Sequence, residues 1–243
     1  MVLSSDPAFL IELLKHGDMQ VTGQFMWGSN YTFLCDIRYQ GQVHQGVYKP
    51  VRGERPLWDF PNETLAGREV AAYLLSEGGG WHMVPPTVFR QQAPSGPGSL
   101  QSYVEHDPEY HYFQFSQNDK ASVRPVVLFD VVANNTDRKA GHILVDPQGQ
   151  LWLIDHGVCF HVEPKLRTVI WDFAGQPLTD QEIAQLENLN AKLGPDGDLY
   201  QQLCDYLSRR EIQAISGRIE ETLQAGIFPF PRQDRYSMPW PPV

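Results

Sequence analysis

An amphipathic stretch opens the chain, and alternating apolar and polar positions follow it. The opening stretch, MVLSSDPAFLIELLKHG, predicts a helix with Asp6 as its N-cap. The alternation and its turn signals predict three strands, at residues 19–27, 30–39 and 44–50. Gly28-Ser29 lies at the first joint between these strands, and Gln40-Gly41 lies at the second.

A second helical pattern covers residues 62–80, where Asn62 is the predicted N-cap and three consecutive glycines end the helix. Residues 84–89 predict a short edge strand. The stretch QQAPSGPGS is rich in glycine and proline and predicts a loop, and LQSYVE at residues 100–105 predicts another strand.

The pattern becomes helical after residue 106. Residues 121–135 predict a buried helix, and HILV and LWLI predict a hairpin joined by the turn DPQGQ. Two capping boxes each precede an amphipathic pattern, Thr179 with Glu182 and Ser208 with Glu211. The tail at residues 228–243 is too rich in proline for regular structure.

The order of elements predicts an α+β fold with two lobes. A small strand-rich N-lobe covers residues 1–105, and a helical C-lobe covers residues 106–243. We expect an active site in the cleft between the lobes.

Composition narrows the class of protein. The chain has 243 residues and a net charge of −10, which disfavours non-specific binding to nucleic acid or to an anionic membrane surface. No apolar run approaches the length of a membrane span. Three scattered cysteines disfavour a disulfide framework or a zinc site. We therefore expect a soluble cytoplasmic protein.

Phosphoryl transfer from ATP needs small residues over the phosphates, a lysine, a carboxylate that holds the lysine, and two aspartates. The sequence contains candidates for all of them, in a workable order. Small residues at Gly28-Ser29-Asn30 can cover phosphates, or they form an ordinary hairpin turn. Lys49 ends a strand and needs an anion only if it points inward. Glu69 lies in the following helix, where it either reaches Lys49 or belongs to a solvated helix face.

Two aspartates bracket the predicted hairpin. Asp137 follows a helix in NNTDR, and Asp155 follows a strand in LIDHG. One acid in a loop is common, but this pair follows both a lysine strand and a glutamate helix. One aspartate can orient the attacking hydroxyl while the other holds a metal ion.

The segments NNTDRKAGHILV and LWLIDHGVCF resemble the catalytic and metal-binding segments of the phosphatidylinositol 3/4-kinase superfamily. They are most similar to those of type II phosphatidylinositol 4-kinases. WGSNYTF and GVYKP resemble that family's phosphate loop and lysine strand, and LQSYVEHDPEYHYF resembles its hinge. The chain also resembles compact, uncharacterised bacterial proteins of this superfamily.

The resemblance implies a protein-kinase-like fold with ATP in the cleft and magnesium or manganese as the metal. By position, Asp137 is the catalytic aspartate, Asp155 a metal ligand, and Glu69 the partner of Lys49. The phosphates are implied to contact the glycine-loop residues and Lys49. The adenine is implied to face the hinge, at Tyr103, Val104 and Glu105.

One position departs from the family's pattern. The family has an asparagine five residues after the catalytic aspartate, as a second metal ligand, and this chain has His142. Magnesium prefers oxygen ligands. His142 therefore binds a softer ion such as manganese, contacts a phosphate or water, marks a weakened catalyst, or packs beside Gly141.

The acceptor is expected to be a protein or small-molecule hydroxyl rather than a membrane lipid, because the family's membrane devices are missing. Lys165 and Arg167 either hold an anionic substrate or pair with Glu163 and Asp172. Asp130, in the apolar helix, is expected to brace the catalytic loop with Arg138.

Two other functions stay open. A pseudokinase would bind nucleotide, or none, and act through a protein partner, for which the proline-rich tail is one candidate surface. Transfer of AMP from the same pocket is the other.

Overall fold

A computed structural model of the chain describes residues 7–25, 30–233 and 236–243. One antiparallel sheet has the order β1-β2-β3-β5-β4, formed by β1 (Asp18–Phe25), β2 (Thr32–Tyr39), β3 (Gln42–Pro50), β4 (Thr87–Arg90) and β5 (Gly98–Ser102). The three N-terminal strands and the predicted edge strand are confirmed. The predicted N-cap Asp6 lies outside the described residues.

The turn between β2 and β3 follows the sequence signal. Gln40 and Gly41 have φ values of 47° and 78°, as a two-residue hairpin with the natural twist requires. The predicted loop before β5 is too long, however, because β5 begins at Gly98. A Cβ atom at Gly98 would lie 2.4 Å from the Lys49 carbonyl oxygen, so this glycine permits a close approach between strands.

Helix α2 (Leu65–Gly78) begins later than the sequence predicts, with Thr64 rather than Asn62 as its N-cap. The Glu54 carboxylate accepts hydrogen bonds from the N–H groups of Leu65 (3.2 Å) and Ala66 (2.8 Å). A remote acid therefore satisfies the first turn, and the local capping signal at Asn62 is not used.

The second half of the chain is mainly helical. The predicted buried helix is α4 (Arg124–Ala133), and the predicted hairpin is β6 (Ile143–Val145) with β7 (Leu151–Leu153). Both capping boxes are present, at the starts of α5 (Asp180–Lys192) and α7 (Arg209–Ala225). The part of the chain that the structure describes also contains α3 (Gln117–Ser122), α6 (Asp198–Leu203) and the 3₁₀ turns η1 (Val51–Gly53), η2 (Tyr112–Gln114) and η3 (Ala140–His142).

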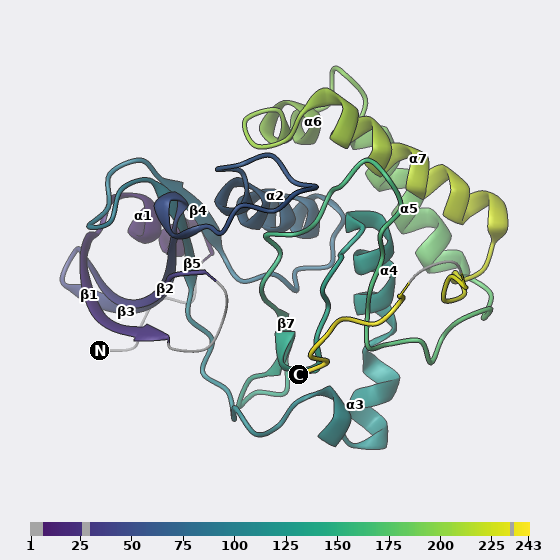
Figure 1. Cartoon of the computed structure of the whole chain (residues 1–243), viewed down its shortest axis with the longest axis horizontal. Coiled ribbons are helices and arrows are strands. Elements are labelled where there is room, and N and C mark those ends of the chain that lie inside the picture. The colour runs from purple at the N-terminus through teal and green to yellow at the C-terminus, as the bar shows by residue number, and fades with distance from the viewer. Residues whose placement is uncertain (1–6, 26–29, 234–235) are drawn as a thin grey trace.

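Two apolar cores lie on either side of the molecule. Helix α1 (Pro7–His16) covers the sheet and buries Leu13 and Leu14 against it. The larger core lies among the helices and includes Ala71, Ala72 and Leu75 of α2. Figure 1 shows the sheet with α1 at one end, helices α3, α4, α5 and α7 at the other, and α2 between them.

None of the helices in the described ranges is both long and apolar enough to cross a membrane. The tail leaves α7 without regular structure and returns towards β7, where Figure 1 marks the end of the chain.

Candidate active site

A cavity of about 330 Å³ lies between the sheet and the helical part. Its wall includes most of the side chains predicted from the sequence: Asn30, Lys49, Glu69, Tyr103, Val104, Asp137, His142 and Asp155. Two of the predicted phosphate-loop residues, Gly28 and Ser29, lie outside the described residues. Glu105 is exposed and does not line the cavity.

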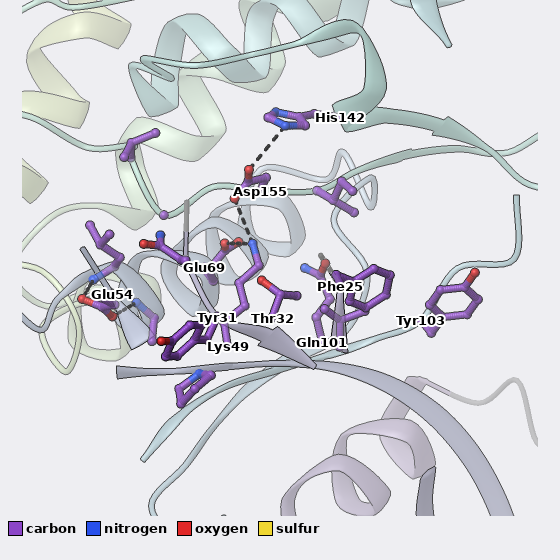
Figure 2. A pocket seen from close by; sticks show the side chains of 18 of the residues that line it. Phe25, Tyr31, Thr32, Lys49, Glu54, Glu69, Gln101, Tyr103, His142 and Asp155 are labelled. Carbon is purple, nitrogen blue, oxygen red and sulfur yellow. Dashed lines mark hydrogen bonds and ion pairs between the residues drawn. The ribbon is translucent and has the colours of Figure 1, made fainter. Parts of the chain in front are cut away.

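Lys49 connects three parts of the fold. It extends from β3 into the cavity and forms an ion pair with Glu69 of α2. Its Nζ atom also lies 2.9 Å from Asp155 Oδ1 (Figure 2). Burial disfavours the charged ammonium, but Asp155 and Glu69 outweigh that effect and raise the pKa of Lys49. The lysine is therefore charged and points inward.

Arg68, the residue before Glu69 in α2, fixes this helix in place. Arg68 is buried, donates to the Cys159 carbonyl (2.7 Å) and forms an ion pair with Glu211 of α7. Glu69 is also buried, and its second oxygen accepts the His156 backbone N–H at 2.9 Å. The alternative of a solvated helix face is thus excluded for Glu69.

Asp155 lies in the loop after β7 with a φ of 62°, a left-handed conformation that aspartate tolerates better than most residues. Its side chain is half exposed towards the cavity, and the Lys49 ammonium holds its pKa well below the usual range. His142 Nε2 lies 3.3 Å from Asp155 Oδ2. Burial lowers the pKa of His142 to about 4, so this imidazole is neutral at pH 7.

The tautomer of His142 follows from its two neighbours. The Lys139 backbone N–H points to Nδ1 at 3.4 Å, which makes Nδ1 the acceptor. Nε2 then carries the proton and donates it to Asp155.

Asp137 lies in the loop that follows α4. Asn134 ends that helix in a left-handed conformation, and the Asn135 side chain accepts the Asp137 backbone N–H at 3.0 Å. Burial and the charge of Asp155 raise the pKa of Asp137 to about 6, although Lys139, whose Nζ lies 3.6 Å away, opposes the shift. Asp137 is therefore a carboxylate close to its titration point at neutral pH.

A buried network supports this loop. Asp130 and Arg138 are both fully buried and form an ion pair at 2.9 Å, which is the brace expected from the sequence. Arg138 also donates to the Ile154 carbonyl (3.0 Å) and to His156 Nε2 (2.8 Å). The guanidinium of Arg138 thus connects the residue next to Asp137 with the residues on both sides of Asp155.

The hinge side of the cavity is formed after β5. The Tyr103 N–H bonds to the Gln45 carbonyl at 3.0 Å, so this amide is already used by the sheet. The Val104 carbonyl accepts a hydrogen bond from His106 Nδ1 at 2.8 Å. On the phosphate side, the Asn30 side chain accepts the Arg55 N–H at 2.8 Å.

Lys165 and Arg167 differ in their surroundings. Lys165 pairs with Asp59 at 2.7 Å and stacks over the ring of the exposed Trp58 at 5.0 Å, rather than pairing with a neighbouring acid. Asp172, the other predicted partner, accepts a hydrogen bond from a tyrosine hydroxyl of η2. Arg167 is exposed and acts electrostatically on Asp137.

Two residues of the site were missed from the sequence. Glu54 lines the cavity and caps α2, and no local pattern singles it out. His156 links Arg138 to Glu69. Its position directly after Asp155 was the available signal.

Within the described ranges, no group of three or more histidine, cysteine, aspartate or glutamate side chains is arranged to hold a metal ion. The oxygen-bearing side chains that face the cavity are nevertheless suited to magnesium, which is commonly held by one or two carboxylates together with substrate phosphates. Asp155 is the better placed, because it is half exposed and ionised.

Comparison with known proteins identifies the family. The family model described as phosphatidylinositol 3- and 4-kinase matches residues 63–208, which include Glu69, Asp137 and Asp155 but not Lys49. Protein Rv2133c of Mycobacterium tuberculosis is 38% identical over 264 residues, covering 94% of this chain and 94% of that protein.

A plant relative and a solved structure are also similar. Phosphatidylinositol 4-kinase gamma 7 of Arabidopsis thaliana is 30% identical over 179 residues, covering 61% of this chain and 26% of the plant protein. This chain therefore spans about a quarter of that kinase's length. A structure of hydra Fam20 with sugar has a TM-score of 0.56 at 12% identity and covers 92% of this chain and 89% of its own. The two-lobed α+β fold predicted from the sequence is confirmed.

Proposed function

Because the chain belongs to the phosphatidylinositol 3- and 4-kinase family, we propose that it transfers a phosphoryl group from ATP to a hydroxyl in a metal-dependent reaction. One observation carries the proposal. Lys49, Glu69, Asp137 and Asp155 come from four separate segments and all line one cavity. Phosphoryl transfer depends mainly on positioning and on charge stabilisation, and this set of side chains supports both.

Lys49 is assigned to the ATP phosphates. Its ammonium is charged and faces the cavity, where Glu69 holds it from α2. Asn30, with Gly28 and Ser29, is assigned to the phosphate side. The backbone of Tyr103 and Val104 is assigned to the adenine.

Asp155 is assigned as the ligand of magnesium or manganese. The bound metal would neutralise charge on the phosphates. His142 is assigned to Asp155 rather than to the metal, because its Nε2 proton is directed at the carboxylate. This role beside Asp155 was not among the interpretations left open by the sequence, and it is supported by the contact between His142 and Asp155.

Asp137 is assigned as the residue that orients the acceptor hydroxyl and accepts its proton. A pKa of about 6 leaves most of it ionised at pH 7 while keeping it basic enough to take a proton. Lys139 and Arg167 supply positive charge beside it.

The acceptor is proposed to be a protein or small-molecule hydroxyl. The name of the plant kinase specifies phosphatidylinositol as the substrate of that protein, and this substrate is not carried over to the present chain. In this chain the net charge of −10 disfavours an anionic membrane surface, and Lys165 is already neutralised by Asp59.

The lobe boundary and the location belong to the same proposal. We place the boundary between residues 105 and 106, because the chain after β5 has no regular structure there and the two apolar cores are distinct. A cytoplasmic location is supported by three free cysteines, two of them buried.

The test is ADP formation with ATP and either magnesium or manganese, compared with the same mixture in EDTA. Metal-dependent ADP release by the natural chain, absent in the Asp137→Asn variant, is the expected result. Equal ADP release by both chains would remove Asp137 from the proposed mechanism. The masses of the products distinguish transfer of phosphate from transfer of AMP.

One observation favours a nucleotide-binding pseudokinase as the second candidate. The Asp155 carboxylate is already engaged by Lys49 and His142, which a metal would have to displace or share. Such a protein would act through a partner, with the proline-rich tail as one candidate surface. It predicts stabilisation by ATP without ADP formation.

A further inference from the structure

The tail crosses the catalytic loop and bonds to it directly. The Ala140 N–H donates to the Pro242 carbonyl at 2.8 Å. The Thr168 N–H and the Trp171 indole N–H both donate to the Ser237 carbonyl, at 3.1 Å and 3.2 Å. Residues 237–242, named here the tail strap, thus contact two segments that are far away in the sequence.

Both segments contain or adjoin the proposed catalytic aspartate. Ala140 begins η3, three residues after Asp137. Thr168 forms a parallel bridge with Arg138, in which the Arg138 N–H bonds to the Arg167 carbonyl at 3.0 Å. The tail strap therefore supports the loop just after Asp137, directly at Ala140 and through Thr168 at Arg138.

The side chains of residues 237–240 alternate between a covered and an uncovered side, and Pro241 is exposed as well. Pro239 is buried, and Ser237 and Pro242 are half-buried. Met238 and Trp240 are exposed, by 47% and 88%. The alternation is that of an extended segment with one face packed against the protein.

The amides that the tail strap satisfies belong to fully buried residues, Ala140 and Thr168. A buried N–H without an acceptor is strongly disfavoured, and the first N–H groups of a helical turn have no acceptor within that turn. Without Pro242 and Ser237, these two amides must shift to find another acceptor, and the loop must shift with them.

We propose that the tail strap is a positioning element for the reaction, which holds the catalytic loop so that Asp137 faces the transferred phosphoryl group. This inference rests on the proposed function. Among the described residues, no hydrogen bond joins the strap to Lys49 or to the hinge, so we expect it to act on the transfer step rather than on nucleotide binding.

The first test is a chain that ends at Tyr236. Its ATP-dependent thermal stabilisation is expected to match that of the full chain, while its kcat falls at least about tenfold, as for a misplaced catalytic group. Adding the peptide of residues 237–243 is expected to restore part of the kcat. Met238→Ala is the control, because its exposed side chain lies off the covered face. A shortened chain with full kcat would overturn the proposal.

The second test does not depend on turnover or on deletion. Trp171→Phe removes the indole N–H that donates to the Ser237 carbonyl and leaves a smaller aromatic ring in its place. The loss of one hydrogen bond should raise the equilibrium constant for opening of the strap about 2- to 10-fold. The measurement is hydrogen exchange at the amides of Ala140 and Thr168, which should become faster by the same factor. Unchanged exchange would show that the strap does not hold the loop. If the full-length chain shows no turnover, only the proposed function is refuted. Hydrogen exchange still tests whether the strap holds the loop.

Discussion

Lys49 and Asp155 are 106 residues apart in the sequence, yet Lys49 Nζ lies 2.9 Å from Asp155 Oδ1. The sheet supplies the lysine, and the loop after β7 supplies the aspartate. Glu69 contacts the same ammonium from α2. One cation therefore joins both lobes at the place where the phosphates of ATP are proposed to lie.

Replacing Asp155 with asparagine should abolish the metal dependence of nucleotide binding. The variant keeps the shape of the side chain but loses the negative charge that a divalent ion requires. We expect the thermal shift with ATP to become the same in magnesium, manganese and EDTA. Asp196→Asn is the matched control, because Asp196 is exposed and far from the cavity wall. A metal-dependent shift that survives in Asp155→Asn would assign the metal elsewhere.

Replacing Lys49 with methionine should reduce turnover at least about 100-fold, the usual effect of removing a group that stabilises transition-state charge. It also leaves the buried Glu69 carboxylate without its cation, so the melting temperature should fall. Lys15→Met, on the exposed side of α1, is the control. Turnover and melting temperature equal to those of the natural chain would show that Lys49 has no role in the site.

Replacing His142 with asparagine should favour magnesium. Asparagine offers an oxygen at a position where the imidazole presents only a proton to Asp155. The thermal shift with ATP and magnesium should therefore increase relative to the shift with manganese. His82→Asn, at an exposed site, controls for the loss of an imidazole. If manganese-supported binding is lost instead, His142 is itself a manganese ligand.

Three of the site residues predicted from the sequence share one property. Lys49, Asp137 and Asp155 each lie at or just after the end of a strand or helix, where the hydrophobic pattern stops and a polar side chain faces the cavity. Such positions can be found by local rules. That the three side chains meet in one cavity could be expected only from the order of the motifs along the chain.

The contacts that were missed depend on long-range packing. Glu54 reaches the start of α2 from the preceding loop, and so the local N-cap signal at Asn62 failed. Lys165 pairs with Asp59, 106 residues earlier, because the loop before α2 lies against the segment after Asp155. No local pattern records these contacts.

Replacing Asp137 with asparagine should stabilise the protein at neutral pH. Its pKa is raised from 3.8 to about 6 in the folded chain, so folding favours the protonated carboxyl. The stabilisation from the protonated carboxyl is fully present below the pKa of the unfolded chain, 3.8, and is lost as the pH rises through the folded pKa of about 6. The melting temperature of the variant relative to the natural chain should thus increase between about pH 4 and pH 6 and stay level above about pH 7. Asp196→Asn, at an exposed site that does not line the cavity, is the control.

The same titration should appear in the activity of the natural chain. Turnover should fall as the pH drops through about 6, because Asp137 becomes protonated and can no longer accept the hydroxyl proton. A rate that stays constant from about pH 7.5 down to pH 5 would contradict the assignment of Asp137 as the base.

Replacing Asp130 with alanine should lower the free energy of unfolding by about 3–5 kcal/mol, the range for breaking a buried ion pair. Asp130 and Arg138 are both fully buried, and Arg138 would keep a charge without a counter-ion. The measurement is a urea denaturation curve. Glu12→Ala disrupts the exposed pair with His16 and should change stability by at most about 0.5 kcal/mol.

The result of Asp130→Ala also shows what Arg138 does for the site. Arg138 donates to the carbonyls of His142 and Ile154, one in each of the two segments that carry the aspartates. If these carbonyls and His156 sufficed to hold the guanidinium, the loss would stay below about 1 kcal/mol. A large loss, with faster hydrogen exchange at both segments, would show that the Asp130 charge keeps Arg138 in place. The positions of Asp137 and Asp155 would then depend on a pair that does not line the cavity.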